Sequence, residues 1–243
     1  MIEVRGLRKR FGEVVAVDDV SFTARDGHVT GLLGPNGAGK TTALRVLYGL
    51  LDSDQGEVLV DGVNVGTAPQ EARRRMGVLP DSRGLCVRLT AREHLRYFGR
   101  LQGLSAAAVE ESIDRLVTQL EMGDIIDRRV QGFSQGERVK VALGRALVHE
   151  PSNVLLDEPT NGLDVGATRA MRRFIRDMRA KGTCVLFSSH IMQEVAALCD
   201  RLVILSKRRT VAEGTPEQIL TASGQTNLED AFVSLTGLDE VGA

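Results

Sequence analysis

One stretch of the chain matches the spacing G-x-x-x-x-G-K-[ST], in which Gly34 and Gly39 precede Lys40 and Thr41. Glycines at these places let backbone N–H groups converge on phosphate oxygens without a Cβ in the way. Lys40 would supply a positive charge at the β- and γ-phosphates, and the Thr41 hydroxyl could ligate Mg²⁺. A chance match in a chain of this length is on the order of one in a hundred. We therefore predict a phosphate-binding loop made of Gly34, Pro35, Asn36, Gly37, Ala38, Gly39, Lys40, Thr41 and Thr42.

Two adjacent carboxylates, Asp157 and Glu158, end the apolar run Val154–Leu156. Ligands of a parallel sheet sit at the carboxyl ends of its strands, so both acids would face the phosphate loop. Asp157 is placed to hold Mg²⁺, and Glu158 to orient or deprotonate an attacking water. Two acids alone would more often form a solvated turn. The phosphate loop upstream favours the catalytic interpretation.

A third motif, Phe133–Glu137, begins a helix shortly before the acidic strand. Ser134 and Glu137 have the spacing of a capping box, and Gly136 permits a close approach of backbone. A helix N-terminus of this kind can bind an anion. In isolation these five residues are better explained as an ordinary capped helix.

The elements that must position these motifs follow from the pattern of apolar residues. Short β-prone pieces in residues 2–23 predict an antiparallel edge sheet. A compact apolar strand leads into the phosphate loop, and apolar residues at helical spacing follow it over Lys40–Leu50. The predicted strands are Ile2–Val4, Val14–Val17, Val20–Thr23, Val29–Leu33, Val58–Val60, Met76–Leu79, Asn153–Asp157, Thr183–Phe187 and Leu202–Leu205.

Helical patterns fill most of the remaining chain. From a capping box at Thr90 to about His149 the pattern is helical, with breaks at Gly103, Gly123 and Gly132. Another helix is predicted over Val165–Ala180, and a late one has a proline, Pro216, at its first helical position. Strands that alternate with helices predict a parallel sheet with crossover helices.

Composition excludes several classes of function. The formal net charge is −1, aromatic residues make up 4% and Trp is absent, which argues against nucleic acid as a partner. The three cysteines include no CxxC pair, so we expect a reduced, cytosolic protein without a disulfide framework. No apolar run approaches the roughly 18 residues of a transmembrane helix. Any role at a membrane must therefore come through a partner.

The order of phosphate loop, helical insertion, Ser-x-Gly helix start and acidic strand resembles the ATP-binding cassette (ABC) ATPase family over nearly the whole chain. Phe133–Glu137 resembles the family's signature loop, Asn161–Asp164 its D-loop and His190 its switch histidine. Phe11 lies where the family stacks an aromatic ring on adenine. The implied fold is α/β, a P-loop NTPase of the ABC ATPase type. It has a mixed sheet, an antiparallel β edge subdomain and an α-helical insertion.

The resemblance also implies how such a site works. Residues 1–243 would form one domain, with a helical subdomain at about 88–150 and a C-terminal tail at about 221–243. Two copies, a homodimer or heterodimer with the homodimer favoured, would hold two ATP molecules between them. Ser134, Gly136 and Asp164 would contact nucleotide, and Glu158 and His190 would act in hydrolysis. Mg²⁺ would be held by Thr41, Asp157 and Asp81; Asp81 replaces the family's usual Gln.

Three segments point to a subfamily. Leu79–Leu85, Leu89–Glu93 and Asn227–Phe232 resemble the ATPases of ABC-2-type exporters, and the first two resemble the sodium-extrusion branch. The implied partner is a membrane permease that exports sodium or a drug, with this subunit on the inner face of the membrane. Two alternatives remain: a soluble ABC ATPase without a transport role, and a phosphotransferase of another P-loop family, which would leave Ser134–Glu137 and His190 without a role.

Overall fold

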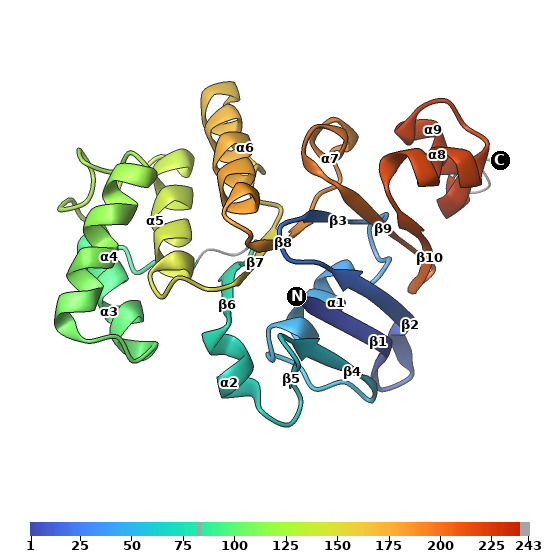
Figure 1. The fold of residues 1–243 in the computed structure, drawn as a ribbon, viewed down its shortest axis with the longest axis horizontal. Helices are drawn as coiled ribbons and strands as arrows, with labels where there is room; N and C mark the ends of the chain where they lie inside the picture. Colours follow the sequence, from blue (N-terminus) through green and yellow to red (C-terminus); the bar gives the residue numbers. More distant parts are fainter. Residues whose placement is uncertain (82–83, 239–243) are drawn as a thin grey trace.

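The computed structural model describes residues 1–81 and 84–238, which form ten strands and nine helices (Figure 1). The strands are β1 Ile2–Phe11, β2 Val14–Ala24, β3 Val29–Leu33, β4 Gln55–Val60, β5 Val63–Asn64, β6 Met76–Leu79, β7 Asn153–Asp157, β8 Cys184–Ser188, β9 Arg201–Ser206 and β10 Arg209–Gly214. The helices are α1 Lys40–Leu47, α2 Pro69–Arg74, α3 Ala91–Leu101, α4 Ala106–Gln119, α5 Gln135–Leu147, α6 Val165–Ala180, α7 Met192–Leu198, α8 Pro216–Ser223 and α9 Leu228–Thr236.

A six-stranded sheet with the order β10-β9-β3-β8-β7-β6 runs through the middle of the molecule. All neighbours pair in parallel except β10, which pairs antiparallel with β9. Every residue of β3, β7 and β8 is buried, as the unbroken apolar runs of these strands require. The predicted mixed sheet with crossover helices is confirmed.

A separate four-stranded antiparallel sheet, β2-β1-β4-β5, forms the predicted β subdomain. Two long strands, β1 and β2, replace the short pieces expected from the sequence. The register shifts between Val4 and Leu7, where Gly6 has a φ of 56°. Ile2, Val4 and Leu7 are all buried, so this bulge lets an interrupted apolar pattern point to one face. The interruption is why the sequence predicted only the first part of this strand, Ile2–Val4.

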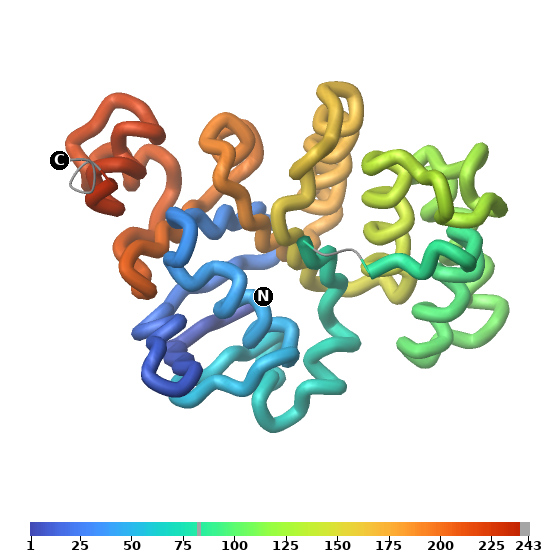
Figure 2. Tube along the Cα trace, turned by 180° about the vertical axis from the view of Figure 1, so that it is seen from behind, coloured from blue at the N-terminus to red at the C-terminus, as the bar shows by residue number. Residues whose placement is uncertain are grey.

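Helices α3, α4 and α5 gather at one end of the molecule, and α8 and α9 at the other, in both views (Figure 2). Thr90 and Ser134 cap α3 and α5 through complete capping boxes, as predicted. Gly103, Gly123 and Gly132 all lie between helices of this group. None of the helices in the described residues combines the length and apolar composition that crossing a bilayer requires.

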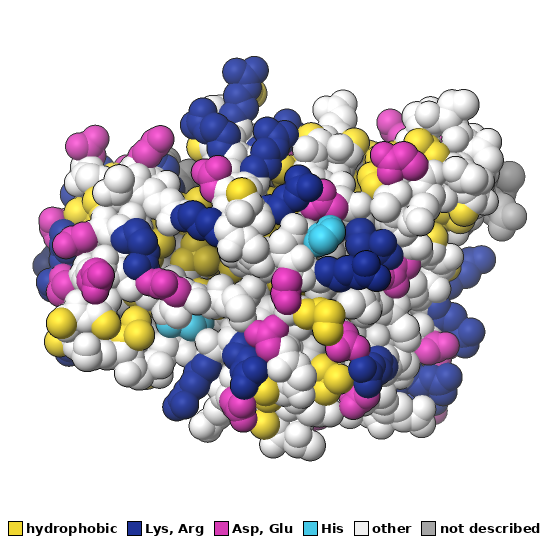
Figure 3. All heavy atoms as spheres, in the orientation of Figure 1, with side chains coloured by type: hydrophobic (Ala, Val, Ile, Leu, Met, Phe, Trp, Pro, Cys, Tyr) yellow, Lys and Arg dark blue, Asp and Glu magenta, His cyan; other side chains and the backbone are white. Residues whose placement is uncertain are grey.

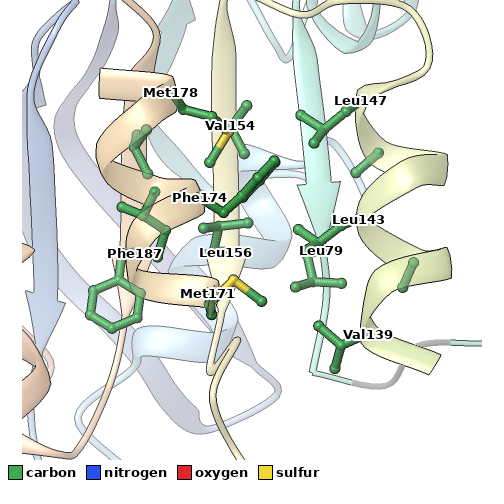
Figure 4. Close-up of a cluster of buried hydrophobic side chains, with 14 of the residues drawn as sticks. Leu79, Val139, Leu143, Leu147, Val154, Leu156, Met171, Phe174, Met178 and Phe187 are labelled. Carbon is green, nitrogen blue, oxygen red and sulfur yellow. The ribbon is translucent and has the colours of Figure 1, made fainter. Parts of the chain in front are cut away.

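The apolar face of α6 packs on the central sheet (Figure 4). Met171, Phe174 and Met178 follow one another at helical spacing and lie against the β7 side chains Val154 and Leu156. The same cluster continues through β6 to α5, and it is almost fully removed from water. Truncating a buried Phe of this kind to Ala costs about 3–5 kcal/mol. This core fixes the carboxyl end of β7, where the acidic pair lies.

One helix boundary and several elements differ from the sequence prediction. The helix after the phosphate loop ends at Leu47 rather than Leu50, because Gly49 adopts a φ of 65°. The hairpin strand β10 and the short helices α2 and α7 were not predicted. Helix α9 lies within the expected C-terminal tail, whose last five residues, 239–243, fall outside the described residues.

Candidate nucleotide-binding site

The carboxyl ends of three neighbouring parallel strands meet at one edge of the central sheet. Ser188 of β8 pairs in register with Leu32 of β3 on one side and with Asp157 of β7 on the other. The phosphate loop follows β3, and Glu158 follows Asp157 directly. Ligands of open α/β sheets bind at such an edge. Residues far apart in the sequence are thus brought to one place.

The loop itself depends on two glycines for its path. A Cβ on Gly34 would lie 2.6 Å from the carbonyl oxygen of Leu205, and one on Gly39 would lie 2.7 Å from that of Ala16. Gly39 also has a φ of 98° and directly precedes α1. No other residue fits these two places without moving backbone. The free N–H groups at the start of α1 then point toward the loop, as anion binding requires.

Lys40 folds back over the loop that carries it. Its Nζ donates hydrogen bonds to the carbonyl oxygens of Gly34 and of Pro35, the latter at 3.2 Å. Burial lowers the pKa of Lys40, while the charges of Glu158 and Asp157 oppose that shift. The charges of both carboxylates of the acidic pair therefore act on the Lys40 ammonium group.

A cavity of about 370 Å³ opens between the loop and strand β2. Phe11 pairs with Val14, a lining residue, across the β1–β2 turn, and the Phe11 residue is 49% exposed. An exposed ring beside the cavity has the access that stacking on a base needs. The lining residues are Val14, Val15, Ala16, Pro35, Asn36, Gly37, Gly39, Lys40, Thr41, Thr42 and Arg208.

Asp157 is buried at the strand end and is only 8% exposed. Ser188 Oγ donates a hydrogen bond to its Oδ1 at 2.6 Å. Burial raises the pKa of Asp157; the Ser188 hydrogen bond lowers it, and the nearby charge of Asp81 raises it further. A cation bound beside Asp157 would stabilise its buried negative charge.

The donors around Asp157 fit Mg²⁺. Asp157 and Asp81 offer carboxylate oxygens and Thr41 a hydroxyl, which are the hard ligands that Mg²⁺ prefers. No group of three or more His, Cys, Asp or Glu side chains in the described residues forms a closed metal cage. Mg²⁺ is typically held by one or two carboxylates together with substrate phosphates, where it neutralises charge on those phosphates.

Glu158 has a left-handed backbone, with a φ of 48°. Its N–H donates to Ser188 twice, to the carbonyl oxygen at 3.2 Å and to Oγ at 3.1 Å. Its Oε2 lies 2.9 Å from Nδ1 of His190, whose side chain is 60% exposed. Strained backbone of this kind is retained where the surroundings hold it in place. Here it turns the carboxylate toward His190.

His190 also borders the phosphate loop. A second cavity, of about 270 Å³, lies between the loop and the start of α7. It is lined by Leu33, Gly34, Pro35, Asn36, Ser189, His190, Met192 and Phe232. The loop, the acidic pair and the histidine therefore form one continuous site.

The arrangement matches what known proteins share with this chain. A family model described as "ABC transporter" matches residues 17–161, more than half of the chain. The chain belongs to the ABC transporter family. It is 42% identical over 239 residues to the ABC transporter ATP-binding protein NatA of Bacillus subtilis, covering 96% of this chain and 97% of NatA. It is 40% identical over 219 residues to the Nod factor export ATP-binding protein I of Burkholderia lata, covering 90% and 72%.

A solved structure of an ATP-binding subunit of an ABC transporter has the same fold, with a TM-score of 0.90. The two chains are 31% identical, and the match covers 97% of this chain and 99% of that one. The chain is accordingly an ABC ATPase, the ATP-binding and ATP-hydrolysing subunit of an ABC transporter. This family membership excludes a phosphotransferase of another P-loop family.

The predicted signature loop and D-loop of this ABC ATPase lie apart from the phosphate loop. Ser134 Oγ accepts from the N–H of Glu137 at 3.2 Å, and Asp164 Oδ1 accepts from the N–H of Ala167 at 2.8 Å. They cap α5 and α6, whose first turns adjoin each other. In the described part of the chain, neither cavity beside the phosphate loop is lined by Ser134, Gly136 or Asp164. Their role in nucleotide binding stays a prediction.

Asp81 directly follows the β6–Pro80 segment, and its charge acts on Asp157. This closeness agrees with its predicted place in the Mg²⁺ shell, although its role stays a prediction. The segment Leu79–Leu85, which resembles the exporter branch, includes residues 82 and 83, and these lie outside the described residues.

Sequence reasoning missed three contributors to the site. Ser188 joins Asp157 and Glu158, and only its place at the end of a strand hinted at this. Glu194 is 3% exposed and accepts hydrogen bonds from Thr160 and Ser189, one in the loop after each catalytic strand. Arg208 lines the phosphate cavity from a hairpin that the sequence did not predict.

Proposed function

We propose that this ABC ATPase works as a head-to-tail homodimer in which each ATP is held by two copies. One observation carries the proposal. The phosphate loop, Glu158 and His190 form one site, whereas the helix starts at Ser134 and Asp164 lie outside it in the same chain. These helix N-termini can each offer N–H groups to an anion. A second, rotated copy can bring them to the first copy's phosphate loop.

Within this site, the loop from Gly34 to Thr42 binds the phosphates and Phe11 stacks on adenine. Glu158 orients and deprotonates water, and His190, within hydrogen-bond reach of its carboxylate, holds that carboxylate in place. Asp157, Asp81 and Thr41 hold Mg²⁺. The buried environment of Asp157 supports this role, because a bound cation compensates its buried charge.

We further propose that the dimer powers export through a separate membrane permease at the inner face of the membrane. The relatives named above support this, since one is a Nod factor export protein by name. The absence of a membrane-spanning helix from the described residues fits an ATPase that reaches the membrane through its partner. Sodium or a drug as the cargo stays a prediction.

A subunit-mixing experiment tests the shared site. Lys40→Ala removes the phosphate contact and Gly136→Asp blocks the signature loop, so each homodimer should be inactive. A mixture contains heterodimers with one site in which both parts are intact, and its ATPase activity should return. A mixture as inactive as either variant alone would exclude the head-to-tail site.

The permease is tested by affinity capture from membranes with the Glu158→Gln protein and MgATP. We expect a polytopic membrane protein to co-purify, and less of it with Lys40→Ala as the matched control. Capture of soluble partners alone would favour a non-transport ABC ATPase.

A further inference from the structure

Strands β9 and β10 are joined by a two-residue loop, Lys207-Arg208. Ser206 pairs with Arg209, so the hairpin closes directly around these two residues. Lys207 has a φ of 48° and Arg208 a φ of 71°. Positive φ at both central residues is the mark of a type I′ turn, where Asn-Gly or Gly-Gly is strongly preferred. Neither Lys nor Arg is suited to this turn, because a Cβ disfavours left-handed backbone.

The place of the hairpin is fixed by strand β2. The N–H of Asp18 donates to the carbonyl oxygen of Arg208 at 2.8 Å, and Arg209 Nε donates to the Asp18 carboxylate at 2.9 Å. Thr210 Oγ1 donates to the carbonyl oxygen of Ser21 at 3.0 Å and accepts from its N–H. Figure 1 shows β10 beside β2. The tip of the hairpin is therefore held next to the strand that walls the phosphate cavity.

Arg208 lines that cavity together with the phosphate loop. The cavity lining contains two cations, Lys40 and Arg208, and no carboxylate. Within the described residues, the Arg208 side chain is exposed and makes no recorded ion pair or hydrogen bond, whereas its neighbour Arg209 is bound to Asp18. Arg208, whose backbone is strained, therefore presents an unpaired guanidinium group at the phosphate cavity.

We propose that Arg208 is a further nucleotide-binding residue, whose guanidinium contacts the ribose and α-phosphate end of the bound nucleotide. This inference rests on the proposed function, in which the loop binds the β- and γ-phosphates and Phe11 stacks on adenine. The backbone of Arg208 is bonded to Asp18 of β2, and Arg208 lines the cavity together with the phosphate loop and with Val14, Val15 and Ala16. A planar fork of N–H donors suits phosphate and ribose oxygens.

The test compares three variants of the full chain by calorimetric titration with MgATP and with MgADP. Arg208→Gly removes the cation and suits the turn, and it should weaken both nucleotides about tenfold, as loss of a charge-assisted hydrogen bond does. Arg208→Lys keeps the charge and should lie between parent and Arg208→Gly. Lys207→Gly is the matched control in the same turn, and its affinities should equal those of the parent.

Thermal unfolding without nucleotide is the second measurement. Both glycine variants should raise Tm, by about 2–4 °C each, because glycine relieves the left-handed strain. An Arg208→Gly protein that is stabilised in this way but binds both nucleotides like the parent would overturn the inference. A loss confined to MgATP would also overturn it, since the contact would then be at the γ-phosphate. If the parent binds no nucleotide at all, the proposed function itself fails.

Discussion

Nδ1 of His190 lies 2.9 Å from Oε2 of Glu158, although the two residues follow different strands of the central sheet. Ser188, two residues before His190, holds the backbone of Glu158 from the other side. Hydrogen bonds therefore hold both the backbone N–H and the side-chain carboxylate of Glu158. Such fixing is what a group that must orient water requires, since small displacements cost catalytic rate.

Replacing Glu158 with Gln should leave ATP binding intact and reduce hydrolysis by about a hundredfold or more. The amide keeps the shape of the side chain and its contact with His190, but it cannot accept a proton from water. Steady-state phosphate release measures the rate, and size-exclusion chromatography with MgATP should show a trapped dimer. Turnover at the parental rate would remove Glu158 from its assigned role.

Lys40→Ala should weaken MgATP binding by about one to two orders of magnitude. The ammonium group already lies at the loop's own carbonyl oxygens, so it is in place for the β- and γ-phosphates. Titration calorimetry gives the affinity, with Lys181→Ala as the control because that lysine is exposed and outside the cavity. Unchanged affinity in Lys40→Ala would contradict the phosphate-loop assignment.

Asp81→Gln should alter coupling to the permease more than the ATPase rate of the isolated subunit. Gln gains N–H donors and loses a charge that raises the pKa of Asp157. The measurement compares isolated ATPase activity with activity in membranes that contain the permease. Equal changes in the two rates would show that Asp81 acts only at the Mg²⁺ site.

The parts of the site that could be predicted from the sequence are those whose residues lie close together along the chain. The phosphate loop, the acidic pair and the capping boxes at Thr90 and Ser134 depend on residues within a few positions of one another. The Ser188 contacts and the place of Arg208 depend on which strands are neighbours, and no short spacing encodes that. Bulges such as the one at Gly6 also hide periodicity, which is why β1 was predicted too short.

Stability should fall as the pH drops from about 7 to 5, and His94 and His149 should account for part of the loss. In each, Nε2 donates to a backbone carbonyl at 3.0 Å, while Nδ1 is buried and has no hydrogen-bond partner among the residues that the structure describes. Burial lowers the pKa of both histidines. As the pH falls, these histidines are therefore protonated in the unfolded chain before they are protonated in the folded protein. The two histidines contribute fully to the free energy of unfolding above their unfolded pKa of about 6.5. This contribution is lost as the pH falls through their lower folded pKa.

Urea unfolding at several pH values measures this effect. The double variant His94→Gln, His149→Gln keeps an N–H donor at each place but cannot be protonated, so its stability should depend less on pH. His28, which is only partly buried and hydrogen-bonds near the surface, supplies a control as His28→Gln. Equal pH dependence of the parent and the double variant would refute the assignment.

The buried carboxylate of Glu194 should stabilise both loops of the site. It accepts hydrogen bonds from Thr160 and, at 3.4 Å, from Ser189, and it lies 3.8 Å from Arg172 of α6. Thr160 and Ser189 are both almost fully buried. Glu194→Ala would remove the acceptor of both hydroxyl groups, and Ser189 Oγ would keep only the N–H of Ile191 as a donor among the described residues. The change should cost about 3 kcal/mol, or about 6–12 °C in Tm.

Catalysis should respond to the same change, because Thr160 lies two residues after Glu158 and Ser189 directly precedes His190. We expect Glu194→Ala to lower kcat while the affinity for MgATP, which depends on the phosphate loop, changes little. Glu194→Gln still accepts from Thr160 and should recover much of both stability and kcat. A Glu194→Ala protein as stable and as active as the parent would show that the two loops hold Glu158 and His190 without it.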